Sequence, residues 1–232
     1  MLTTDLNLLR ALAEGINKCK KCHGTDLSCT CRRKYNHELA KIKAHIPAKY
    51  RNYTLSDIKD PASQKIVQKI ERYIVKLDVN KQRGSGLYLH GNPGTAKSTL
   101  GSVILMNALT RRYTGYFTTA KEFLELSVTK RDDPEARTIV KYLTDVDFLL
   151  IDDLGREYRD QKGFVESQLD ELIRYRTDNL LPTIITTNKP KEVLAADNFR
   201  LMSILQEHFV VIPFVTKDYR PQIGAQLQNE KK

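Results

Sequence analysis

The stretch Gly91-Asn92-Pro93-Gly94-Thr95-Ala96-Lys97-Ser98 decides the fold of this chain. It follows an apolar run that predicts a strand at 87–90, and it precedes a pattern that predicts a helix at 99–112. A glycine-rich loop between a strand and a helix directs backbone N–H groups into a concave anion site. Lys97 can then reach the β and γ phosphates of ATP, and the Ser98 hydroxyl is suited to ligate magnesium. We expect nucleotide contacts from Gly91, Asn92, Pro93, Gly94, Thr95, Ala96, Lys97, Ser98 and Thr99.

One position of this loop departs from the usual pattern. Ala96 stands where a second glycine is normal, and its methyl group crowds the backbone where the chain must curl around phosphate. A negative φ at Ala96 would relieve the crowding. Otherwise we expect weakened ATP binding and slower hydrolysis.

A second motif lies at the end of a later strand. Further strands are predicted at 116–118, 148–151, 183–187 and 209–212, separated by helical patterns, which indicates crossover units and a parallel sheet. The strand at 148–151 delivers Asp152 and Asp153 at its carboxyl end, where such sheets bind ligands. Asp152 is expected to hold magnesium, and Asp153 to orient or deprotonate the attacking water. A helix-capping aspartate alone would explain only one of the two carboxylates.

The strand at 183–187 ends in Thr186-Thr187-Asn188, and a polar side chain there can reach the γ-phosphate or the attacking water. Arginines complete the candidate site, because a neighbouring subunit can supply one to stabilise the transition state. A surface ion pair is the ordinary alternative for any single arginine. The candidates beyond the acidic strand are Arg174, Arg176, Arg200 and Arg220.

The region before this core has a different pattern. Residues 1–17 predict an amphipathic helix, a second helix covers Leu39, Ile42 and Ile46, and Pro47 is expected to end it. Residues 48–61 form a predicted connector, followed by a helix at 63–77 and a loop at 80–86. We place two domains at 1–60 and 61–232.

All four cysteines lie in this first region. Cys19, Cys22, Cys29 and Cys31 present four thiolates within thirteen residues, and zinc favours four soft ligands in a tetrahedron. Because the cysteines are clustered and no signal peptide is evident, a metal is a better explanation than disulfides. Reduced thiols without metal and an iron–sulfur cluster are the alternatives.

The charge of the chain favours an anionic partner. The 232 residues carry a formal net charge of +10. Residues 18–51 contain ten Lys and Arg against two acids, which leaves +8 there. Nucleic acid or an acidic protein surface fits this excess, and a merely solubilising face is the alternative. No run approaches the ~18 apolar residues of a membrane helix, so we expect a soluble, cytoplasmic protein with no membrane partner.

With these residues placed, the chain resembles the AAA+ ATPases of the DnaC and DnaI type, which are bacterial and phage helicase loaders, and the related IstB transposition proteins. The motifs that carry the resemblance are GLYLHGNPGTAKSTL (86–100), DFLLIDDLG (147–155), RYRTDNLLPTIITTN (174–188) and DYRP (218–221). The second aspartate stands where many relatives have Glu. The resemblance implies a five-stranded α/β sheet ordered 5-1-4-3-2, with helices on both faces and no C-terminal lid.

The resemblance also implies roles for single residues. Asn188 corresponds to the first sensor and Arg220 to the second. Arg200 ranks first, and Arg176 second, as the trans-acting arginine finger, the arginine that acts on the nucleotide of a neighbouring subunit. In this sequence Met202-Ser203-Ile204 stands where relatives commonly have a Ser-Arg pair. Phage relatives commonly carry CxxC followed by CxC at this place, which supports zinc.

These observations predict an ATPase that loads a helicase. It would bind a hexameric replicative helicase through its N-terminal module, deliver it to single-stranded DNA and self-associate through the ATPase domain. We expect it in the cytoplasm of a bacterial cell, encoded by the bacterium or by a phage. Two alternatives stay open. One is an IstB-like transposition regulator that forms filaments on duplex DNA. The other is a zinc-dependent nucleic-acid-binding adaptor that binds nucleotide without turnover.

Overall fold

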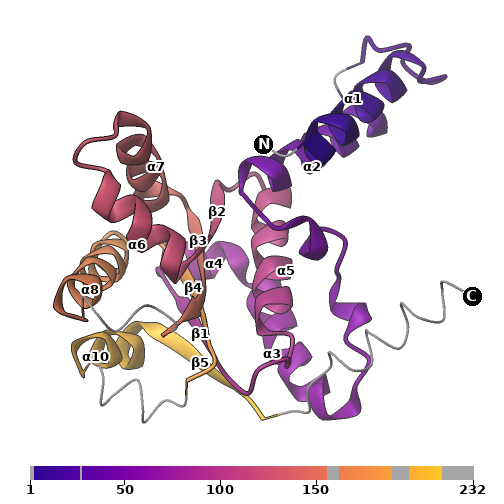
Figure 1. Ribbon diagram of the computed structural model, residues 1–232. Coiled ribbons are helices and arrows are strands. Elements are labelled where there is room, and N and C mark those ends of the chain that lie inside the picture. The colour runs from indigo at the N-terminus through magenta and orange to yellow at the C-terminus, as the bar shows by residue number, and fades with distance from the viewer. Residues whose placement is uncertain (1–2, 27, 156–161, 190–198, 216–232) are drawn as a thin grey trace, which may run out of the picture.

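The computed structural model describes residues 3–26, 28–155, 162–189 and 199–215; for residues 3, 4, 162–166, 199 and 200 it describes the backbone alone. A single parallel sheet organises the fold, with helices on both faces (Figure 1). The strands are β1 (Gly86–Gly91), β2 (Gly115–Thr119), β3 (Phe148–Leu154), β4 (Thr183–Thr187) and β5 (Phe209–Phe214). Their order β2-β3-β4-β1-β5, with every pair parallel, confirms the predicted 5-1-4-3-2 sheet.

The helices before and after the phosphate loop cover one face of the sheet, and the later helices cover the other (Figure 1). The first face is packed by α3 (Gln64–Val75) and α5 (Lys97–Thr110), with α4 (Leu77–Gln82) beside them. The second face is packed by α6 (Ala120–Thr129), α7 (Pro134–Asp145), α8 (Lys162–Asp178) and α10 (Phe199–His208).

Alternating side chains of the strands divide the core between these two faces. Phe148 and Leu150 of β3 pack toward α5, while Leu149 and Ile151 pack toward the later helices. Because successive strand residues point to opposite faces, a strand covered on both sides must be apolar throughout. This is why β3 reads as an unbroken apolar run until Asp152.

The N-terminal region is a helical hairpin that projects away from the sheet (Figure 1). It consists of α1 (Thr3–Asn17) and α2 (Thr30–Lys43), which pack on each other with the cysteines at their junction. Within the described residues, no helix combines the length and apolar character required to cross a membrane.

The second helix ends earlier than the sequence pattern predicted. It stops at Lys43 rather than at Pro47, because His45 takes a left-handed conformation with φ 55°. The N–H of His45 donates to the Ile42 carbonyl and that of Ile46 donates to the Lys41 carbonyl, which is the hydrogen-bond pattern of a Schellman cap. The turn sends Ile46, which is fully buried, into the core beneath α5.

The connector docks on the sheet domain through three short 3₁₀ turns, Ala48–Tyr50, Leu55–Asp57 and Pro61–Ser63. Ile58 is buried in the same core as α5, and the Phe117 N–H donates to the Ala44 carbonyl. The loop predicted at 80–86 is shorter than expected, because α4 extends to Gln82. The first region and the sheet domain therefore share one packed core.

Candidate functional site: a nucleotide centre and a four-cysteine cluster

The phosphate loop connects β1 to α5 at the carboxyl edge of the sheet. Gly91 has φ 141°, and a Cβ built on it would lie 2.2 Å from the Phe214 carbonyl oxygen, so no larger residue fits between β1 and β5. Gly94 also has a positive φ, 78°. The Thr95 hydroxyl donates to the Asn92 carbonyl at 2.8 Å, which closes the turn from inside.

Lys97 begins α5 and is buried, with 5% of its surface exposed. Its ammonium donates to the carbonyl oxygens of Gly91 and Asn92 at 2.9 and 2.7 Å. The charge therefore lies inside the curl of the loop, where a phosphate group could replace these carbonyls as its partner.

Ala96 adopts φ 66° and ψ 20°, the left-handed conformation, at the N-cap of α5. Because φ is positive, the crowding by the Ala96 methyl group is not relieved. For a residue with a Cβ this conformation costs roughly 1–2 kcal/mol, and glycine avoids the cost. The loop keeps its shape because Leu100 N–H donates to the Ala96 carbonyl at 2.9 Å, which starts the helix.

The acidic pair lies directly beside the loop. Asp152 is 6% exposed, and its carboxylate accepts a hydrogen bond from the Thr186 hydroxyl. Burial raises the pKa of Asp152, while the nearby hydroxyls of Ser98 and Thr186 oppose the rise. The two predicted magnesium ligands, Ser98 and Asp152, therefore lie near each other.

Asp153 turns away from Asp152 and meets the predicted sensor. It has φ 57°, and the Asn188 amide donates to its Oδ1 at 2.9 Å. The structure thus brings together Lys97, Ser98, Asp152, Asp153 and Asn188 from β1–α5, β3 and β4. Sequence reasoning singled out all five and the Thr186–Asn188 motif, but it missed the hydrogen bonds that the Thr186 hydroxyl makes to both aspartates.

Arg176 is in a different place from the one its predicted role requires. It is fully buried, and its guanidinium donates to the carbonyls of Leu143, Thr144, Val146 and Pro182 and to the Thr183 hydroxyl at 2.9–3.2 Å. These partners lie where β3 and β4 begin, at the opposite edge from Asp152. Burial lowers the pKa of Arg176 to about 9, which still leaves a cation at neutral pH. Because it is fully buried, Arg176 cannot reach the nucleotide of a neighbouring subunit, and its prediction as the second-ranked trans-acting arginine is wrong.

The other arginine assignments fall outside what the structure describes. Arg200 lies in the first turn of α10, but its side chain is not among the described ones, and Arg220 lies beyond the described residues. Arg174 is exposed on α8.

The four cysteines form a second candidate site, at the junction of α1 and α2. Their sulfur atoms all lie within 4.8 Å of one another, with Cys19–Cys29 at 3.8 Å and Cys22–Cys31 at 3.5 Å. A tetrahedral zinc ion with Zn–S bonds of about 2.3 Å needs sulfurs about 3.8 Å apart, so the cluster fits zinc. Backbone N–H groups of Cys22 and Lys21 lower the pKa of the Cys19 thiol to about 6, whereas burial raises the pKa of the Cys31 thiol to about 12. A metal ion would have to stabilise the Cys31 thiolate.

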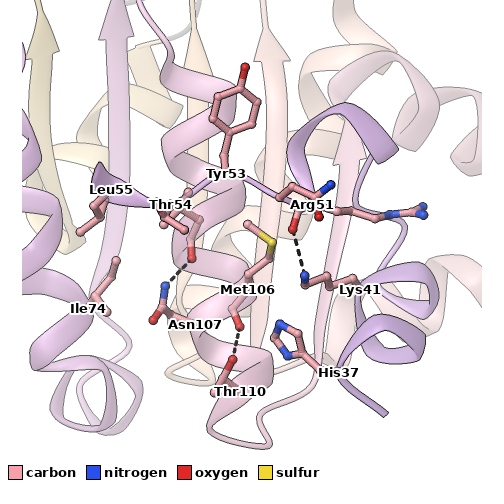
Figure 2. Close-up of a pocket in the computed structure, with 12 residues that line it drawn as sticks. His37, Lys41, Arg51, Tyr53, Thr54, Leu55, Ile74, Met106, Asn107 and Thr110 are labelled. Atoms are coloured by element: carbon pink, nitrogen blue, oxygen red, sulfur yellow. Dashed lines mark hydrogen bonds between the residues drawn. The ribbon is translucent and has the colours of Figure 1, made fainter. Parts of the chain in front are cut away.

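A separate cavity of about 500 Å³ lies between α2, the connector, α3 and α5 (Figure 2). It runs along the later turns of α5, from Val103 to Thr110, away from the phosphate loop. Two of its cations are already paired: the Lys41 ammonium donates to the Arg51 carbonyl at 2.9 Å and contacts Glu38, and Arg51 contacts Asp5. The cavity is therefore not the nucleotide site.

The sheet order, the phosphate loop and the adjacent acidic pair define a P-loop domain of the AAA+ class. Residues 27–197 match the family of IstB-like ATP binding proteins, and the chain belongs to this family. A comparison with curated proteins finds no match.

Several solved structures have the same fold, and the first two are shorter chains that are matched over almost their whole length. The crystal structure of the DnaC helicase loader is 24% identical, with a TM-score of 0.62 over 72% of this chain and 99% of that one. The crystal structure of DnaI is 25% identical, with a TM-score of 0.61 over 73% of this chain and 95% of that one. The structure of AMPPCP-bound DnaA from Aquifex aeolicus is 18% identical, with a TM-score of 0.59 over 80% and 56%.

Proposed function

We propose that this protein is an ATP-dependent helicase loader, which binds a hexameric replicative helicase and delivers it to single-stranded DNA. The observation that carries the proposal is the combination of a four-cysteine hairpin with an AAA+ nucleotide site on one chain. The fold likeness to the DnaC helicase loader, which extends over nearly the whole of that chain, supports it.

ATP with magnesium would supply the phosphoryl chemistry at the carboxyl edge of the sheet. Lys97 would exchange its carbonyl partners for phosphate oxygens, and Ser98 and Asp152 would hold the metal. Asp153 would orient the attacking water, with Asn188 fixing its carboxylate through the 2.9 Å hydrogen bond. Arg200 would act on the nucleotide of a neighbouring subunit and Arg220 on its own, which implies self-association through the ATPase domain.

The α1–α2 hairpin would bind the helicase. Zinc held by Cys19, Cys22, Cys29 and Cys31 would fix the α1–α2 junction, which leaves Leu6 and Leu8 of α1 about 40% exposed on its surface. Exposed leucines on an ordered helix suit a hydrophobic groove of a partner. We keep residues 1–60 as the functional module, in a cytoplasmic protein of a bacterium or its phage.

A second candidate is an IstB-like transposition regulator that assembles on duplex DNA. The family match favours it, because the matched residues 27–197 include almost the whole nucleotide site. The four-cysteine hairpin favours the loader, since it adds a separate module to that site.

The test uses the full chain, because Ile46 and Ile58 belong to the core of the sheet domain and a cut at residue 60 would expose that core. Immobilised protein is offered lysate of the native cell, and the eluate is analysed for a hexameric helicase. We expect its capture by the wild type and its loss in Leu6→Asp with Leu8→Asp. Val128→Asp, at an exposed apolar residue of α6, is the matched control.

Two outcomes would overturn the loader. Capture of a transposase together with filaments on duplex DNA would establish the alternative. Absence of ATP hydrolysis with and without single-stranded DNA would instead indicate an adaptor that binds nucleotide without turnover.

A further inference from the structure

One hydroxyl group lies between the two acidic residues of the nucleotide site. Thr186 Oγ1 donates to Asp152 Oδ1 at 2.5 Å and accepts the backbone N–H of Asp153 at 3.1 Å. The Thr186 side chain is 1% exposed, so water does not compete for these bonds.

The strand register explains why this hydroxyl is available to both residues. β3 and β4 pair Ile151 with Ile185 and then Leu154 with Thr187, so Asp152 and Asp153 together stand opposite Thr186 alone. Two residues opposite one define a β-bulge, which interrupts the ladder and re-aims a side chain. At this bulge the Asp153 N–H donates to the Thr186 hydroxyl.

The bulge also sets where the second carboxylate points. Asp153 takes φ 57°, a conformation that costs of order 1–3 kcal/mol for a residue other than glycine and persists only where its surroundings fix it. Two contacts fix it here: the Thr186 hydroxyl at its N–H and the Asn188 amide at its carboxylate. Without the first contact, an extended Asp153 would direct its carboxylate to the other side of the strand.

We infer that Thr186 is a positioning residue of the nucleotide site, whose single hydroxyl fixes both the metal-binding carboxylate and the carboxylate that orients water. This inference rests on the proposed ATPase function. Thr186 occupies one oxygen of Asp152, which holds the rotamer of that carboxylate beside Ser98, and through the backbone of Asp153 it sets the direction of the second one. It acts through the two aspartates and touches no reacting atom itself.

The decisive comparison is between Thr186→Val, which keeps the shape and removes the hydroxyl, and Thr186→Ser, which keeps the hydroxyl. We expect Thr186→Val to lower kcat for MgATP by about 100-fold, the usual effect of a misplaced catalytic group, with a much smaller change in KM. Thr186→Ser should restore most of the rate. Because unfolded protein would also lower the apparent kcat without changing KM, the rate is normalised to the folded fraction of each variant.

Thr187→Val is the matched structural control. Thr187 is the next residue of β4, is fully buried, and donates to the Leu154 carbonyl at 2.6 Å. It should lower the melting temperature about as much as Thr186→Val but keep kcat. If Thr186→Val does not fold, Thr186→Cys replaces it with the same expectation, because a thiol is a weak donor and acceptor.

A second readout does not depend on turnover. Binding of a fluorescent ATP analogue is titrated with magnesium, and Thr186→Val should require several-fold more magnesium than the wild type. If the wild type does not hydrolyse ATP, the ATPase proposal fails while this titration still tests Thr186. The inference is overturned if Thr186→Val keeps both kcat and the magnesium requirement, or if Thr187→Val loses them equally.

Discussion

Asp5 and Arg51 form an ion pair that ties the N-terminal helix to the connector. Both guanidinium Nη atoms of Arg51 donate to the Asp5 carboxylate, and Arg51 Nε donates to the Ile46 carbonyl at 2.7 Å. The two side chains are only 7% and 9% exposed. Lys41 of α2 donates to the Arg51 carbonyl, so α1, α2 and the connector meet at one residue.

We predict that Asp5→Asn destabilises the hairpin, because removing one partner leaves a buried charge without compensation. The expected loss is roughly 3–5 kcal/mol. Urea unfolding measures it, and hydrogen exchange should show early opening of α1 while β3 stays protected. The exposed Glu14–Lys18 pair is the control, since its side chains are 70% and 81% exposed, and Glu14→Gln should have little effect. Equal effects of the two substitutions would contradict a structural role for Asp5.

Nucleotide binding and hydrolysis should separate at Lys97 and Asp153. Lys97→Ala should abolish ATP binding, because the ammonium inside the loop is the charge nearest to the expected phosphates. Asp153→Asn should bind ATP normally and lose hydrolysis, because it alters only the group that orients water. Isothermal titration and phosphate release measure the two. Lys121→Ala, on an exposed lysine of α6, is the control, and unchanged ATP affinity in Lys97→Ala would refute the phosphate loop.

Ala96→Gly should raise the free energy of unfolding by roughly 1 kcal/mol, because glycine adopts the left-handed conformation without strain. It should also tighten ATP binding or speed turnover, since the methyl group no longer crowds the phosphate loop. Thermal unfolding and steady-state ATPase assays measure these changes. Ala11→Gly, at an exposed position of helix α1, should lower stability instead. Equal stability and kinetics of Ala96→Gly and the wild type would show that the loop tolerates alanine.

Arg176→Ala should strongly lower the free energy of unfolding. It should have little direct effect on the rate of ATP hydrolysis by the protein that remains folded. It removes the donors for four carbonyls and one hydroxyl at the start of β3 and β4, and each buried acceptor left unpaired costs roughly 1–3 kcal/mol. Arg174→Ala, on the exposed side of the same helix, should be nearly neutral. Melting temperatures compare the two.

Replacement of Arg200 should affect ATP hydrolysis rather than stability. Arg200→Ala is expected to bind ATP and keep the melting temperature but lose DNA-stimulated hydrolysis. Mixing it with Asp153→Asn subunits should restore some turnover, since each subunit supplies what its neighbour lacks. No recovery on mixing would remove Arg200 as the trans-acting residue.

Metal analysis should find one zinc ion per chain in protein purified without chelator. Cys29→Ser with Cys31→Ser should abolish it, because both pairs of sulfurs at 3.5–3.8 Å lose a member. Loss of zinc should disorder the α1–α2 junction, as seen by hydrogen exchange, and leave ATP binding intact. Zinc content near zero in the wild type would refute the site, and iron in its place would point to a cluster.

Local patterns predicted most of the nucleotide site. The apolar run at 148–151 could only be a strand buried on both faces, and the residues after such strands must gather at the carboxyl edge of a parallel sheet. The sequence therefore predicts one site for Lys97, Asp152 and Asn188, although these residues lie far apart along the chain. The cysteine spacing likewise predicted a compact cluster, since thirteen residues leave the four thiols little room to separate.

The sequence by itself determined the sheet, its ligand edge and the two candidate centres, because these follow from residue periodicity and from short spacings. Only the tertiary structure decided the environments of long or strained residues. Arg174 and Arg176 look alike in sequence, yet one is exposed and the other binds the carbonyls of two separate segments, 143–146 and Pro182. The Asp5–Arg51 pair, the left-handed Ala96 and the bulge at Asp153 are of the same kind. Each depends on which distant segment packs against the residue, and neighbours within one or two helical turns carry no information about that.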